Sequence, residues 1–135
     1  MKYPRTTISI SIIASVILIV TFLNGCAGMQ ERPSIISISK NAIDTAAASH
    51  NLYKKIVITL YKDGLIGEAE KKEAIKLSEE FDKAYHLAVN TLAAYKKVKS
   101  AVTDKEVDKA IAEMSKLLAD FIGYIQPYVI KKEDS

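Results

Sequence analysis

The sequence predicts an all-α fold: an up-down-up antiparallel three-helix bundle that follows a short apolar helix and an extended tether. Ala, Lys, Glu, Ile and Leu dominate beyond residue 40, and the 135-residue chain has five Gly, three Pro and no Trp, a composition typical of helices. Apolar residues recur three and four positions apart in three segments. Only a few residues separate these segments, and such short connections make consecutive helices antiparallel neighbours.

The N-terminal residues have the pattern of a secretory signal peptide. Lys2 and Arg5 precede a run of 16 uncharged, mostly apolar residues, 8–23. A permanent transmembrane helix needs about 20 such residues, so the run suits a signal peptide whose positive end stays in the cytoplasm.

The next residues, Leu23-Asn24-Gly25-Cys26, resemble the lipobox of bacterial lipoproteins. That pattern has Leu three positions before the cysteine and a small residue directly before it, and Asn24 stands where Ala, Ser or Thr is usual. The resemblance implies removal of residues 1–25, lipid on Cys26 and attachment to a membrane. The residue after the cysteine is Ala27 and not Asp. By the same resemblance, this implies sorting to the outer membrane of a Gram-negative cell, facing the periplasm. The alternative is an uncleaved signal anchor with Cys26 as an inert thiol.

Residues 26–37 are predicted to be the lipidated cysteine and a linker. Gly28 and Pro33 disfavour helix, and Arg32, which precedes a proline, is biased to extended backbone. The eleven residues after the cysteine reach at most about 35–40 Å when extended. The bundle domain, predicted at 38–135, can therefore stand away from the lipid surface.

The first helix of the bundle is predicted from about Ser39 to Asp63. The β-branched run 56–59 could be a strand, but the helical period on both sides and the lack of a partner strand favour helix. Gly64 suits the left-handed position after a helix, with Leu65 packing back on the last turn. The inward positions are Ile43, Ala46, Ala47, Tyr53, Ile56, Val57, Leu60 and Tyr61.

The second helix is predicted from Glu68 to about Ser100, with Gly67 as its cap and acidic residues at the positive end of its dipole. At about 33 residues it is expected to be the longest, with an end that projects beyond its neighbours. Its inward stripe is Ala74, Leu77, Phe81, Ala84, Tyr85, Ala88, Leu92, Tyr95 and Val98.

The third helix has a specific start signal. Thr103 and Glu106 have the spacing of a capping box, in which each residue bonds the backbone amide of the other. Pro127 is expected to end or bend this helix, and residues 131–135 to fray. The inward stripe is Val107, Ala110, Ile111, Met114, Leu117, Leu118, Phe121, Ile125 and Tyr128.

Charge and cysteine content narrow the functional classes. Of the 19 Lys and Arg residues, Lys2 and Arg5 precede Cys26, which leaves 17 against 16 Asp and Glu. A nearly neutral domain lacks the basic excess that nucleic-acid binding requires, so we expect no DNA or RNA partner. A single cysteine permits neither an intramolecular disulfide nor a Cys-based zinc site.

His50 and His86 are the candidate metal ligands or catalytic bases. Counted from the turn at Gly64, their heights along the bundle differ by roughly 8–10 Å, which disfavours joint coordination. No His-Glu-x-x-His or Glu-x-x-His motif is present. We expect both histidines to be ordinary, partly exposed helix residues, and we expect no metal, no cofactor and no enzymatic activity.

Tyrosines are the strongest indication of an interaction. Buried tyrosine needs a hydrogen-bond partner, and tyrosine is favoured at interfaces, so core packing and a partner-binding face both remain open. The six that follow the signal are Tyr53, Tyr61, Tyr85, Tyr95, Tyr124 and Tyr128.

Three lysines gather at the end of the second helix, which is the predicted membrane end. Lys96, Lys97 and Lys99 can contact anionic lipid headgroups. Stabilisation of the negative end of the helix explains them without lipid and is the preferred interpretation.

The leading hypothesis is a lipid-anchored, non-enzymatic helical module of the cell envelope that binds another envelope protein or a second copy. The alternative is a bundle that binds a small ligand or lipid. The pocket of that alternative would be lined by Phe81, Tyr85, Met114, Leu118 and Phe121.

Overall fold

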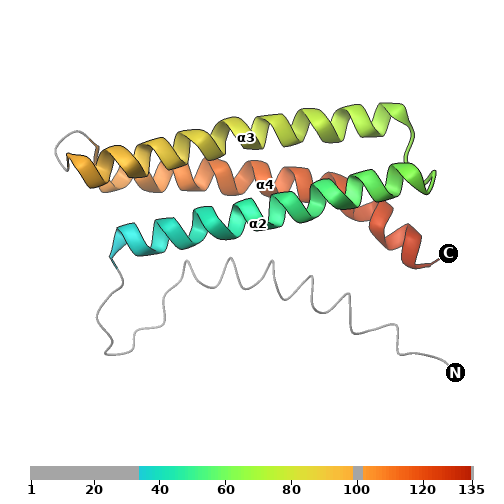
Figure 1. Cartoon of the computed structure of the whole chain (residues 1–135), viewed down its shortest axis with the longest axis horizontal. Coiled ribbons are helices and arrows are strands. Elements are labelled where there is room, and N and C mark those ends of the chain that lie inside the picture. The colour runs from blue at the N-terminus through green and yellow to red at the C-terminus, as the bar shows by residue number, and fades with distance from the viewer. Residues whose placement is uncertain (1–33, 99–101, 135) are drawn as a thin grey trace, which may run out of the picture. The chain divides into compact units, whose positions relative to one another are not determined.

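The computed structural model describes residues 34–98 and 102–134. These residues form three helices, α2 (Ile35–Lys62), α3 (Glu68–Lys97) and α4 (Asp104–Glu133). Each helix packs against the other two, and they run up, down and up (Figure 1). The predicted all-α three-helix bundle is confirmed. The predicted signal peptide and the linker up to Pro33 lie outside the described residues.

Helix α2 begins at Ile35, four residues before the predicted start. The Oγ of Ser34 accepts a hydrogen bond from the amide of Ser37 at 3.3 Å, so Ser34 caps the helix. Ile35 and Ile36, expected in the linker, are half-buried against the core. The last residues of the predicted linker therefore belong to α2, and α2 continues as helix through the β-branched run 56–59.

The turn after α2 has the predicted glycine geometry. Gly64 has a positive φ of 71°, which a residue without Cβ adopts at little cost. Its amide donates to the carbonyl of Tyr61 at 3.1 Å, and the amide of Leu65 donates to the carbonyl of Leu60 at 2.9 Å. These two bonds form a Schellman motif, which satisfies the last carbonyls of α2.

Helix α3 ends at Lys97, three residues earlier than predicted. Val98 closes it with an extended backbone at φ −141° and ψ 93°. Since α3 and α4 each have 30 residues and α2 has 28, the expectation that the second helix is the longest of the three was wrong.

Helix α4 starts with the predicted capping box. Thr103 Oγ1 accepts from the amide of Glu106 at 3.3 Å, and the Glu106 carboxylate accepts from the amide of Thr103 at 2.7 Å. Pro127 does not end the helix, which continues to Glu133, and the last turns bend away from the line of the others (Figure 1). The bend follows from the missing N–H of Pro127, which leaves the carbonyl of Gly123 without its helical donor.

The core consists of two apolar clusters. The first lies toward the start of α2 and includes Phe81 and Met114. The second lies toward the α2–α3 turn and includes Leu60 and Phe121. All four of these side chains are fully buried. The bundle therefore has an apolar interior at both ends, and the group between the two ends is the histidine described next.

Candidate functional site

His50 is buried inside the bundle. Only 3% of His50 is exposed, so the expectation of a partly exposed histidine was wrong at this position. It lies on the inward stripe of α2, between Ala46 and Tyr53, which are also buried. Helical spacing thus directs the imidazole into the core. His86 is exposed, as expected, and its ring lies 5.5 Å from that of Tyr85.

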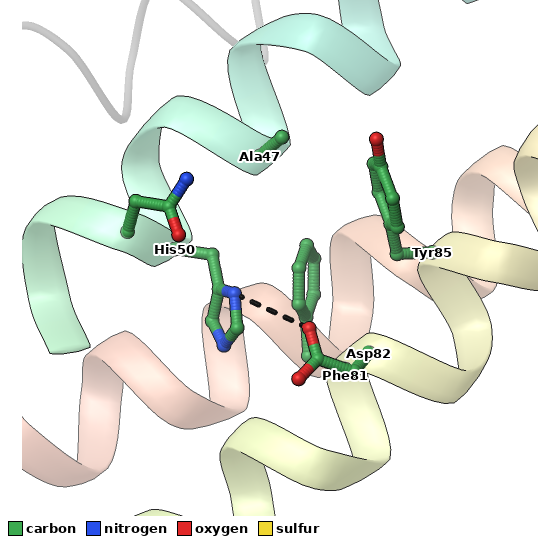
Figure 2. A pocket seen from close by; sticks show the side chains of 6 residues that line it. Ala47, His50, Phe81, Asp82 and Tyr85 are labelled. Atoms are coloured by element: carbon green, nitrogen blue, oxygen red, sulfur yellow. Dashed lines mark ion pairs between the residues drawn. The ribbon is translucent and has the colours of Figure 1, made fainter.

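Two polar side chains of α3 face the imidazole. His50 Nε2 lies 2.8 Å from the Oγ of Ser78, which is itself 7% exposed. His50 Nδ1 lies 3.5 Å from Oδ1 of Asp82, whose side chain is half-exposed (Figure 2). Ser78 and Asp82 are one helical turn apart on α3, so both point to the same side of that helix.

Two phenyl rings also lie close to the imidazole. The centroid of Phe81, from the first core cluster, lies 4.3 Å away. The centroid of Phe121, from the second cluster, lies 5.3 Å away, and the two ring planes are inclined at 63°. Figure 2 shows the Phe81 ring between His50 and Tyr85. His50 therefore connects the two clusters and contacts both α3 and α4.

Burial decides the charge state of His50. Loss of water contact lowers its pKa from 6.5 and outweighs the nearby Asp82 carboxylate, which raises the pKa, while Lys54 lowers it further. The ring is therefore neutral at pH 7. A neutral imidazole has one N–H and one free lone pair, and the Ser78 hydroxyl can match either form at Nε2.

Ser78, His50 and Asp82 have the connectivity of a hydrolase triad, a serine hydroxyl joined to a histidine that faces a carboxylate. A nucleophile must also reach a substrate carbonyl and have backbone donors for the oxyanion. Ser78 is buried and does not line the neighbouring depression. Backbone amides in the middle of α3 are bonded within the helix. The arrangement is therefore suited to joining helices, not to attacking a substrate.

A shallow depression of about 140 Å³ opens between α2 and α3 beside this group. Its lining residues are Ala47, His50, Asn51, Phe81, Asp82 and Tyr85 (Figure 2). Of the predicted pocket residues, only Phe81 and Tyr85 line it, because Met114, Leu118 and Phe121 are packed in the core. Sites for drug-sized ligands have volumes of about 300–1,000 Å³, so the geometry gives little support to the small-ligand alternative.

The six tyrosines do not form one face. Tyr53 and Tyr95 are 8% and 9% exposed, so they pack in the core and are not part of an interaction face. Tyr61, Tyr124 and Tyr128 are half-buried against the second core cluster, near the α2–α3 turn. We call these three the distal tyrosine cluster. Tyr85 lies apart from it, beside the depression.

Polar and aromatic contacts hold the rings of the distal tyrosine cluster in place. The Tyr61 hydroxyl bonds the carboxylate of Glu68, and Lys71 Nζ lies 4.0 Å from the centre of the Tyr61 ring. The rings of Tyr124 and Tyr128 are 6.0 Å apart and inclined at 57°. These contacts order the three tyrosine side chains, whose apolar rings and hydroxyl groups lie at one end of the bundle.

The predicted lysines lie at the opposite end. Lys96 and Lys97 are exposed in the last turn of α3, where the start of α2 also lies (Figure 1). Lys99 and Cys26 lie outside the described residues. Within the described ranges, no group of three or more His, Cys, Asp or Glu side chains is arranged to hold a metal ion.

Comparison with known proteins adds no family. No family model, no curated protein and no solved structure matches the chain. Among residues 34–98 and 102–134, no helix is both long enough and apolar enough to cross a membrane.

Proposed function

We propose that the chain is a lipid-anchored lipoprotein of the bacterial cell envelope whose helical bundle binds another envelope protein and catalyses no reaction. The observation that carries the proposal is the apolar run 8–23 followed by Leu23-Asn24-Gly25-Cys26. With two or three acyl chains on Cys26 the attachment is stable, because each buried methylene contributes about 0.8 kcal/mol.

The position of the anchor gives the bundle a membrane end and a distal end. Seven residues separate Cys26 from Ser34, the cap of α2, and they span at most about 25 Å. Lys96 and Lys97, at the same end of the bundle as Ser34, are then close to the headgroups, where cations are attracted to anionic lipid.

The distal tyrosine cluster is then the surface best placed for a partner. Along α2 the rise from Ile35, at the anchored end, to Tyr61 of this cluster is about 39 Å. Half-buried tyrosines offer rigid apolar area together with a hydroxyl, which is the chemistry enriched at protein interfaces. A partner that approaches from the side away from the membrane meets these rings first. A second copy of the chain is the other occupant to be distinguished.

Site-specific photo-cross-linking in intact cells tests the proposal. A photoreactive residue at position 128, in the distal tyrosine cluster, is expected to trap an envelope protein. The matched control is position 112, an exposed alanine on the same helix. The Cys26→Ser variant of the 128 probe should lose the adduct, since it cannot be lipidated. Equal adducts at 112 and 128, or an undiminished adduct without Cys26, would contradict the proposal, and an adduct of twice the chain mass would identify a second copy.

A further inference from the structure

His50 joins all three helices through one side chain. It belongs to α2, its two nitrogens face Ser78 and Asp82 of α3, and its ring packs on Phe121 of α4. We propose that His50 is an acid-sensitive latch: protonation of the buried imidazole loosens the packing of α2 on α3 and α4. The inference stands on the core of the bundle and depends neither on the lipid anchor nor on a partner.

In the neutral state the latch is well matched to its surroundings. Among the described residues, no buried side-chain nitrogen or oxygen lacks a hydrogen-bond partner. Addition of a proton makes both ring nitrogens donors and places a full charge on a buried side chain that lies close to two phenyl rings. A buried charge is costly unless it is paired and hydrogen-bonded.

The charges around His50 do not remove this cost. On its own helix Lys54 carries the same sign, and on α3 Asp82 carries the opposite sign but is half-exposed to water. From α4 the imidazole is faced by the uncharged ring of Phe121. The net effect is a pKa below 6.5 in the folded chain, with burial as the largest cause.

The direction of the pH effect follows from linkage. In the unfolded chain His50 binds its proton with a pKa near 6.5, and in the folded chain it binds only at lower pH. Between these two values the unfolded state holds more protons, so the free energy of unfolding falls as pH drops below 6.5. Above pH 6.5 the contribution of the neutral His50 to the free energy of unfolding is fully present. Because the imidazole joins α2 to the other helices, we expect α2 to open first.

Hydrogen exchange of the full-length chain in mild detergent tests the latch, at pH 7.5 and pH 5.5 and corrected for the intrinsic exchange rate. Protection of the α2 amides around residue 50 is expected to fall several-fold more at pH 5.5 than protection in the α3–α4 pair. The His50→Gln variant, which can bond Ser78 but cannot gain a proton, should lose most of this acid dependence. His86→Gln is the matched control and should keep it, because His86 is exposed.

Two further measurements test the latch if His50→Gln folds poorly. Asp82→Asn removes the carboxylate that raises the His50 pKa, so the folded-state pKa of His50 moves further below its unfolded value. The variant should therefore lose more α2 protection than the parent at each pH below 6.5. In the His86→Gln chain the single remaining histidine signal in an NMR titration belongs to His50 and should titrate below pH 6.5. The proposal is overturned if that signal titrates at or above pH 6.5, if Asp82→Asn does not alter the acid sensitivity, or if a folded His50→Gln chain opens with acid as the parent does.

Discussion

His50 Nε2 lies 2.8 Å from the Oγ of Ser78, and this hydrogen bond crosses the core from α2 to α3. The partners are 28 residues apart in the sequence, and both are buried. A buried polar pair contributes little net stability when both partners are present, but the loss of one partner leaves the other without a hydrogen bond. The contact is therefore best tested by removing one partner.

Replacement of Ser78 by alanine leaves His50 Nε2 without its partner. We expect the free energy of unfolding to fall by about 1–3 kcal/mol, the usual cost of an unsatisfied buried polar group. Urea unfolding followed by circular dichroism measures it. Ser115→Ala, at a half-buried position of α4, is the control and should change the free energy by less than about 0.5 kcal/mol. Equal losses in both variants would mean that the His50–Ser78 contact has no special role.

Local signals predicted much of the fold. The Thr103–Glu106 capping box and the turn at Gly64 could be read because each depends on atoms within a few residues along the chain. The start of α2 lies before the predicted one because Ser34 caps the helix directly after Pro33, and the proline indicated a linker there.

The polar core could be predicted only in part. The spacing of Ile43, Ala46, His50 and Tyr53 directs the histidine inward, although the absence of a ligand motif led to the expectation of a partly exposed residue. Its partner Ser78 could not be identified, because the register between two helices depends on side-chain packing along their whole contact. The burial of Tyr53 and Tyr95, in contrast, agrees with their positions on the predicted inward stripes of the first and second helices.

Replacement of two glycines by alanine is expected to have opposite effects on the free energy of unfolding. Gly64 has a φ of 71°, where a Cβ is strained, so Gly64→Ala should lower the free energy of unfolding by about 1–2 kcal/mol. Gly123 lies within α4, and a Cβ there meets nothing within 4 Å. Gly123→Ala should raise the free energy by about 0.4–1 kcal/mol, because alanine is the better helix former. Thermal unfolding of the two variants side by side checks the signs, and a stabilising Gly64→Ala would refute the assignment of the turn.

The cap of α4 gives a third prediction. Thr103→Ala removes the hydroxyl that accepts from the Glu106 amide, and loss of such a cap costs about 1 kcal/mol. Thr59→Ala is the control, because Thr59 lies exposed inside α2 and its hydroxyl bonds the carbonyl of Lys55 one turn back. That substitution should be neutral or slightly stabilising. Chemical denaturation distinguishes the two, and a cap variant as stable as the control would contradict the prediction.

Acid should weaken the same cap. The Thr103 backbone amide is the main cause that lowers the pKa of the Glu106 carboxyl below 4.5, and the Thr103 side chain adds to it. The contribution of this carboxylate is therefore present above pH 4.5 and is lost as the pH falls below that value. Protection of the amides in the first turn of α4, corrected for the intrinsic exchange rate, should fall below pH 4.5 in the parent. A Glu106→Gln variant should show a smaller change across that interval, and an identical change would exclude the carboxylate as its source.

Mass spectrometry of the N-terminal peptide, from protein isolated from its native membranes, tests the central proposal most directly. We predict that the peptide begins at Cys26 and carries the added mass of two or three acyl chains. A peptide that retains residues 1–25 with an unmodified Cys26 would contradict the anchor, and with it the orientation proposed for the lysines and the distal tyrosine cluster.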